Sequence, residues 1–210
     1  MSIFDPESKF VQLTNTMLDY LKLGLLFMAF SIPVVTIGAA AAATMTVALK
    51  MARGEALAVW EPFWKAFREN FKLGTILLLF FGLLFALLGF DWYQVMQMES
   101  TAVIRVVRAG IVLLVLVLTS TALYSFAIIA RYELRLKAVL RNAVIYTLLY
   151  FPKNLLTILM IAAGILAYTF LVPLIPLVVT VVPPVVIWYF AKVCTAAFHK
   201  SESAAENIAE

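Results

Sequence analysis

The feature that most constrains this chain is a stretch of 38 residues, Asn154–Ala191, that contains no charged side chain. A single helix of this length would be about 57 Å long at 1.5 Å per residue. That is almost twice the roughly 30 Å hydrocarbon core of a bilayer. The stretch must therefore reverse direction, and Pro173 and Pro176 predict where it turns. We expect Pro183–Pro184 to kink the last helix without ending it, because a turn there leaves one half too short to span.

Two further stretches, Leu73–Phe90 and Ala109–Ala130, are also free of charge and long enough to cross a membrane. The chain is 64% hydrophobic and 13% charged, whereas a soluble domain is about half apolar and a quarter charged. One core of this size cannot bury so much apolar surface. The sequence therefore predicts an all-α fold, a polytopic transmembrane helix bundle of five to six spans that forms a single integral membrane domain.

The N-terminal region allows more than one interpretation, because the charge-free stretch Leu23–Leu49 is interrupted by Pro33. The favoured one is a hairpin of two helices, the second capped by Thr36 and ended by Gly54. A single kinked span is the alternative. A cleaved signal peptide is a third interpretation, opposed by the long acidic segment that precedes the apolar run.

The hairpin interpretation gives six spans, and the kinked span gives five. The six expected spans are approximately 10–32, 36–53, 73–90, 109–130, 154–172 and 177–198.

Lysine and arginine are distributed unequally between the two ends of these spans. Twelve of them fall in or beside segments 50–72 and 131–153 and the C-terminal tail, against only Arg105 and Arg108 on the opposite side. Basic loops stay in the cytoplasm. The C-terminus is therefore predicted to be cytoplasmic, and the N-terminus is inside with six spans and outside with five.

Aromatic side chains recur every three or four residues between positions 60 and 71, with charged residues between them. This pattern predicts an amphipathic helix at the membrane interface. Its aromatic face could dock a partner or anionic lipid, or it could be an aromatic belt that anchors the following span. The candidate interface residues are Trp60, Phe63, Trp64, Phe67, Arg68, Phe71 and Lys72. Segment 131–153 has a similar basic and aromatic pattern, typical of a cytoplasmic coupling helix or an interfacial helix.

Small residues follow the predicted break at Pro33 and Thr36. Gly38, Ala42 and Thr46 are four apart and lie in an alanine-rich run, a pattern that lets helix backbones approach closely in lipid. We expect this face to pack against the partner helix of the hairpin.

The sequence shows no constellation that could carry catalysis. Cys194 and His199 have no partners at metal-ligand spacing, and no phosphate-binding glycine loop or nucleic-acid signature is present. Charge inside the predicted spans is nearly absent: Asp19 and Lys22 lie near one end of the first helix, and no carboxylate lies in the middle of another span. We therefore expect no enzyme activity, no catalytic residue, no metal, no cofactor and no nucleic-acid partner.

Three segments resemble the YesL-like family of predicted bacterial integral membrane proteins. They are FSIPVVTIGAAAAATMTVAL at 30–49, FWKAFRENFKLGT at 63–75 and RNAVIYTLLYFPKNLL at 141–156. The alanines at 39–43 depart from the more mixed small and polar residues of the family pattern. The resemblance implies a multi-pass protein of the bacterial cytoplasmic membrane with a domain of unknown function. Family members are commonly found beside carbohydrate uptake systems of the ABC type.

These features lead to one functional hypothesis and two alternatives. The favoured hypothesis is an accessory or regulatory protein of a carbohydrate uptake system, with the lipid bilayer and either ABC-transporter subunits or a membrane sensor as partners. The chain itself lacks the coupling-loop pattern of an ABC permease in 131–153. The alternatives are a small-solute transporter, with Pro33 and the kinked last helix as its broken elements, and a membrane scaffold or assembly factor.

Overall fold

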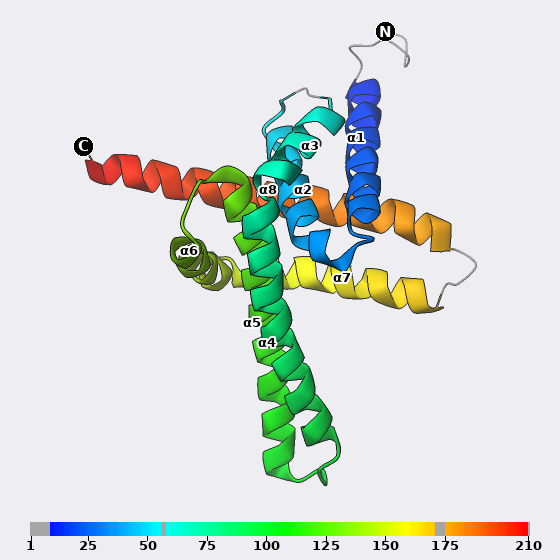
Figure 1. Ribbon diagram of the computed structural model, residues 1–210, viewed down its shortest axis with the longest axis vertical. Helices are drawn as coiled ribbons and strands as arrows, with labels where there is room; N and C mark the ends of the chain where they lie inside the picture. The colour runs from blue at the N-terminus through cyan, green and yellow to red at the C-terminus, as the bar shows by residue number, and fades with distance from the viewer. Residues whose placement is uncertain (1–8, 56–57, 171–174, 210) are drawn as a thin grey trace.

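The computed structural model describes residues 9–55, 58–170 and 175–209, and every regular element in these ranges is helical (Figure 1). The elements are α1 (Lys9–Phe30), the 3₁₀ helix η1 (Val34–Thr36), α2 (Ile37–Ala52), α3 (Trp60–Glu69), α4 (Phe71–Met96), α5 (Ala102–Arg131), α6 (Leu136–Leu149), α7 (Phe151–Phe170) and α8 (Ile175–Ala209). The predicted all-α class is confirmed. The predicted turn at Pro173–Pro176 overlaps residues 171–174, which lie outside the described residues, and Pro176 lies in the first turn of α8.

Several helices are long and apolar enough to cross a membrane. Within the described residues there are four, Val34–Ala52, Phe71–Met96, Ala102–Arg131 and Val181–Ser203. A fifth is added if α6 and the start of α7, which are bent by 94° at Tyr150, form one broken span. These helices fit a multi-pass membrane protein. The predicted first span, 10–32, corresponds to α1, which is not among these candidates.

The first two helices form the predicted hairpin. The Tyr20 hydroxyl donates to the carbonyl oxygen of Ala48 (3.4 Å), and the Thr36 hydroxyl reaches the carbonyl oxygen of Phe30 (2.6 Å). The first bond joins residues far from the turn at Pro33, and the second joins residues close to that turn. Helices α1 and α2 therefore run antiparallel. The hairpin interpretation therefore describes the structure, and the single kinked span does not.

Helix α2 ends as its sequence predicts. Gly54 has a φ of +81°, a left-handed conformation that costs glycine little. The Gly54 amide donates to the carbonyl oxygen of Met51 (3.0 Å), and the Glu55 amide donates to that of Lys50 (3.2 Å). These two bonds form a Schellman motif, which satisfies carbonyl groups that the last turn would otherwise leave unpaired.

Helix α2 is the centre of the fold, and it contacts α1, α3, α4, α5 and α8. Ten of its residues are buried, and most of them are small. One side joins a cluster with Leu77 of α4 and Tyr124 of α5, and the other joins a cluster with Leu23 of α1 and Phe63 of α3. Its small side chains let five neighbours approach one helix.

Helices α4 and α5 form a long hairpin that projects away from the other helices (Figure 1). Helix α2 reaches only its base, where Gly38 meets Gly74 near the start of α4 and the Thr46 hydroxyl lies 3.4 Å from the carbonyl oxygen of Ala130 near the end of α5. Beyond this base the hairpin carries exposed apolar side chains on both helices, including Leu79, Leu83, Leu87, Leu113 and Leu114.

Helices α7 and α8 pack against each other and run across the base of this hairpin rather than alongside it (Figure 1). Helix α8 continues through Pro183 and Pro184, as expected for prolines that do not end the last helix. A Cβ atom on Gly24 of α1 would lie 3.2 Å from Cδ of Pro184. The glycine therefore lets α1 pack closely on the proline-containing part of α8.

Candidate interface and polar clusters

The aromatic residues of α3 surround one phenylalanine from α1. The Phe30 ring lies with its centroid 5.1 to 6.2 Å from the rings of four α3 residues, Trp60, Phe63, Trp64 and Phe67. Tilted aromatic pairs at this separation are favourable beyond the area that they bury. The cluster fixes α3 against the α1–α2 hairpin.

This packing divides the predicted aromatic face in two. Phe63 is fully buried and Phe67 is 8% exposed, so these two rings cannot contact a partner or lipid. Trp60 is 54% exposed, Phe71 is also exposed, and Trp64 is partly exposed. The prediction of one continuous docking face is therefore wrong for Phe63 and Phe67, because Phe30 covers them.

The exposed residues of α3 form a second arrangement, which we call the tryptophan surface and define as Trp60, Trp64 and Arg68. The two indole rings stack with an interplanar angle of 3° and centroids 6.3 Å apart. The Arg68 guanidinium lies 4.6 Å from the centroid of Trp64, within the range of a cation–π interaction. Arg68 and Lys72 are both exposed. The surface thus presents aromatic faces and positive charge together.

The break before α2 is held by side-chain and backbone bonds. The Thr36 hydroxyl lies 2.6 Å from the carbonyl oxygens of both Phe30 and Pro33, so it closes the turn. It makes no capping bond to the amides of α2, and the predicted side-chain cap is therefore wrong. Pro33 is exposed beside the exposed Ile32 and Val34, so the turn itself has an apolar surface.

Gly38 packs on a different helix from the one predicted. A Cβ atom on Gly38 would collide with the carbonyl oxygen of Gly74 and lie 2.6 Å from its carbonyl carbon. A Cβ atom on Gly74 would lie 2.8 Å from backbone atoms of Gly38 and Ala39. Ala42 is fully buried in the cluster that includes α4 and α5. The Gly38 side of α2 therefore packs on α4 rather than on the partner helix of the hairpin.

A buried polar network links α5 to the bend between α6 and α7. The Tyr124 hydroxyl donates to Oδ1 of Asn154 (2.9 Å), and the Asn154 amide nitrogen donates to the carbonyl oxygen of Thr147 (3.2 Å). The hydroxyls of Thr121 and Thr147 are 3.3 Å apart. All four residues are buried. Because Thr147 lies in the last turn of α6, its carbonyl has no partner within the helix, and Asn154 supplies one.

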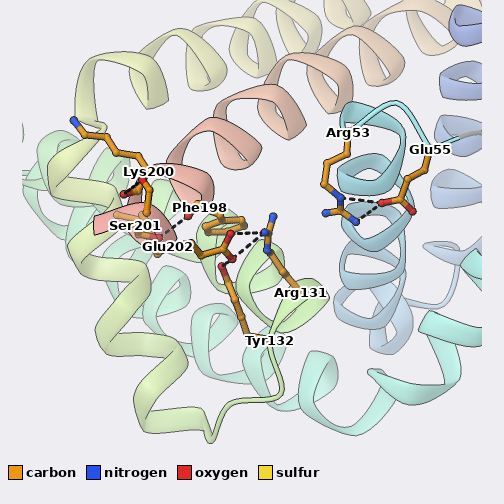
Figure 2. Close-up of polar contacts among 10 residues, drawn as sticks. Arg53, Glu55, Arg131, Tyr132, Phe198, Lys200, Ser201 and Glu202 are labelled. Carbon is orange, nitrogen blue, oxygen red and sulfur yellow. Dashed lines mark hydrogen bonds and ion pairs between the residues drawn. The ribbon is translucent and has the colours of Figure 1, made fainter. Parts of the chain in front are cut away.

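A second polar cluster joins the ends of α5 and α8. The Arg131 guanidinium donates to both carboxylate oxygens of Glu202 (2.8 Å each), and the Tyr132 hydroxyl donates to the same carboxylate (2.6 Å). Figure 2 shows the three side chains converging, with Phe198 beside them. Burial and the hydrogen bond to Glu202 raise the pKa of Tyr132, so its phenol remains a donor. The sequence analysis missed this cluster because its members are about seventy positions apart.

Arg108 closes the far end of the α4–α5 hairpin. Its guanidinium donates to the carbonyl oxygens of Val95 (3.1 Å) and Met98 (3.3 Å), at and just beyond the C-terminal turn of α4. A positive charge there satisfies unpaired carbonyls and opposes the negative end of the helix dipole. Arg108 was predicted only as a charge on the non-cytoplasmic side.

Metal-ligating side chains do not cluster in the part of the chain that the structure describes: no group of three or more His, Cys, Asp or Glu residues is placed to hold an ion. Cys194 is buried there as a free thiol.

Comparison with known proteins gives a match for one part of the chain only. Neither the curated proteins nor the solved structures include a match to this chain. Residues 20–92 match the model of a family described as protein of unknown function, DUF624. The matched stretch runs from α1 through α2 and α3 into α4, so it contains the Pro33 turn, the Gly38–Gly74 contact and the tryptophan surface. The match is consistent with the predicted YesL-like resemblance over this stretch.

Proposed function

We propose that this chain is a non-enzymatic, YesL-like protein of the bacterial cytoplasmic membrane that assists or regulates a carbohydrate uptake system of the ABC type. The observation that carries the proposal is the tryptophan surface of α3. Tryptophan and arginine are the residue types most enriched among the side chains that dominate protein–protein binding. An exposed pair of stacked indoles with an arginine over one of them is suited to contact another protein.

The rigidity of this surface supports the same proposal. Phe63 and Phe67 are buried next to this surface and pack against Phe30. The helix is thus fixed before any partner arrives, and a preorganised surface loses less conformational entropy on binding.

The location of the basic residues supports a cytoplasmic contact. α3 precedes α4 and the Arg131 cluster follows α5, so both lie at the base of the α4–α5 hairpin, opposite the tip that Arg108 closes (Figure 1). Basic segments favour the cytoplasmic side. The tryptophan surface would then face the compartment in which an ABC transporter exposes its nucleotide-binding subunits.

The test is recovery of transporter subunits with the protein in its native membrane. Cells are treated with a membrane-permeant crosslinker, the protein is purified in mild detergent, and subunits of carbohydrate ABC transporters are quantified by mass spectrometry. We expect Trp64→Ala with Arg68→Ala to reduce their recovery about tenfold, which corresponds to a loss of about 1.4 kcal/mol.

Two controls make the result specific. Lys137→Ala changes an exposed lysine on α6, outside the tryptophan surface, and should leave recovery unchanged. The unfolding midpoint in detergent should be the same in both variants and the wild type. Absence of transporter subunits from wild-type preparations would refute the proposal, and a loss of transporter abundance without co-purification would favour an assembly factor.

A small-solute transporter is the second candidate, favoured by the 94° bend between α6 and α7. Broken helices line the binding sites of many transporters, and this bend holds the buried amide of Asn154. Uptake of labelled sugars or oligosaccharides by proteoliposomes that contain only this protein would support that function. A lack of uptake across both classes would count against it.

A further inference from the structure

An apolar cavity of about 500 Å³ lies where α1, α2, α5, α7 and α8 meet. This volume is in the range of small-molecule sites in proteins. Residues from all five helices line it, among them Phe27, Ala41, Thr44, Phe126, Ile161 and Phe190. None of its lining residues belongs to the tryptophan surface or to the polar clusters described above.

The lining restricts what the cavity can bind. Among the described residues that line it, none is charged, and Thr44 and Thr157 are the polar ones. A sugar, a nucleotide or a charged head group would lose its hydrogen bonds to water there without replacement, at a cost of several kcal/mol. The cavity therefore suits a long apolar group that carries at most one or two polar atoms.

Thr44 marks where a polar atom of the ligand would lie. The Thr157 hydroxyl already donates to the carbonyl oxygen of Lys153 (3.4 Å). Thr44 is 3% exposed, and its hydroxyl has no hydrogen-bond partner within the described structure. A buried hydroxyl without a partner is unfavourable by about 1–3 kcal/mol, and an acceptor on a bound molecule would remove that cost.

We propose that this cavity holds one acyl chain of a bilayer phospholipid, with an ester carbonyl oxygen accepting a hydrogen bond from Thr44. The head group remains outside, because the lining offers it no charge. Three of the five helices that line it, α2, α5 and α8, contain candidate membrane spans, and acyl chains are the most abundant apolar molecules in a membrane. Helix α7, which forms one wall of the cavity, also has exposed apolar side chains that can contact lipid: Leu156, Leu159 and Leu166.

The test uses a photoactivatable lipid. The protein is reconstituted into vesicles of phosphatidylethanolamine and phosphatidylglycerol that contain a small fraction of phosphatidylcholine with a diazirine in the middle of one acyl chain. Labelled residues are identified by peptide mass spectrometry after irradiation. We expect adducts on the cavity walls, at Met45 and Ile187, as well as on the exposed positions Leu83 and Leu87 of α4.

Two substitutions separate the cavity from the outer surface. Ala41→Phe fills the cavity and should reduce labelling of Met45 and Ile187 at least fivefold, while labelling of α4 is unchanged. Gly110→Phe adds the same ring at a position with nothing within 4 Å and should leave both unchanged. If Ala41→Phe does not fold, Val186→Phe places a ring in the same cavity from α8.

Thr44→Val keeps the shape of the side chain and removes the hydroxyl. At limiting probe lipid it should lower labelling of the cavity about two- to tenfold, the effect of one net hydrogen bond. Thr119→Val, whose hydroxyl donates to its own helix at Val115, is the matched control and should have no effect.

Four results would contradict the proposal. Adducts confined to exposed positions, or cavity adducts that persist in Ala41→Phe, would show that no chain occupies the cavity. Unchanged labelling in Thr44→Val would show that the Thr44 hydroxyl does not donate a hydrogen bond to the lipid. Cavity labelling by a diazirine fatty acid, with none by the phospholipid, would show that the ligand is a free acid.

Discussion

Helix α2 and the α4–α5 hairpin are both apolar, yet they are buried to very different extents. In the most apolar 18-residue window of each candidate span, 56% of the residues are buried for Val34–Ala52, 17% for α4 and 6% for α5. Hydropathy runs the other way, with a mean of 1.6 for the first and of 2.6 and 2.4 for the others. The less apolar segment is therefore the more deeply buried one.

Side-chain size explains this difference. In lipid, packing between helices gains little from the hydrophobic effect, because the surrounding chains are as apolar as leucine. Close approach of backbones matters more, and the glycine and alanines of α2 permit it. Beyond the base of the hairpin, large side chains such as Leu83 and Leu113 lie outside. In α2, small residues rather than the most hydrophobic ones bring neighbouring helices together.

The largest effect should come from the Gly38–Gly74 contact. Gly38→Val or Gly74→Val forces two backbones apart, and we expect a loss of about 3 kcal/mol or more in the free energy of unfolding. The measurement is unfolding in mixed micelles of mild detergent and dodecyl sulfate, followed by circular dichroism. Gly82→Val, on the exposed part of α4 with nothing within 4 Å, should be close to wild type. An equal loss of unfolding free energy in Gly82→Val and in Gly38→Val would mean that close backbone approach does not hold α2 in place.

A matched pair of leucines on α4 sharpens the comparison. Leu77 is fully buried against α2, and Leu83 is 63% exposed. Leu77→Ala should lower the free energy of unfolding by about 2–5 kcal/mol because it leaves a cavity. Leu83→Ala should change it by less than about 0.5 kcal/mol, measured in the same assay. A large effect of Leu83→Ala would indicate that another protein surface covers the hairpin.

The smallest of the three effects should come from Asn154. Asn154→Leu leaves the Tyr124 hydroxyl and the carbonyl of Thr147 without partners, and we expect a loss of about 1–3 kcal/mol. Hydrogen exchange followed by mass spectrometry should show faster exchange at the end of α6 and the start of α7, with no change in the α4–α5 hairpin. Slower or unchanged exchange at the bend would contradict the role given to this amide.

The sequence predicted the elements well because their signals are local. Long uncharged runs indicate membrane helices, and Thr36 and Gly54 stand where α2 begins and ends. The match to the DUF624 model over residues 20–92 agrees with the resemblance seen in the same region.

The partners of each helix could not be predicted, because they depend on residues far apart in the chain. The small residues of α2 predicted close packing. Because small side chains lie on all sides of this helix, however, the sequence does not indicate which neighbouring helix contacts Gly38. The spacing of the aromatic residues predicted the amphipathic helix α3. Nothing near it in sequence indicated that Phe30 would cover Phe63 and Phe67. Asn154 stood at the predicted start of a span, and its partner Tyr124 lies thirty residues earlier.

The central position of α2 has a consequence for how the chain is made. A ribosome releases this helix early, long before α8, which is one of the five helices that contact it. During synthesis its alanine face therefore lies beside lipid or the insertion machinery until α8 has been made. Only then does α8 close over α2, so chains that stop before α8 leave the middle of the fold uncovered.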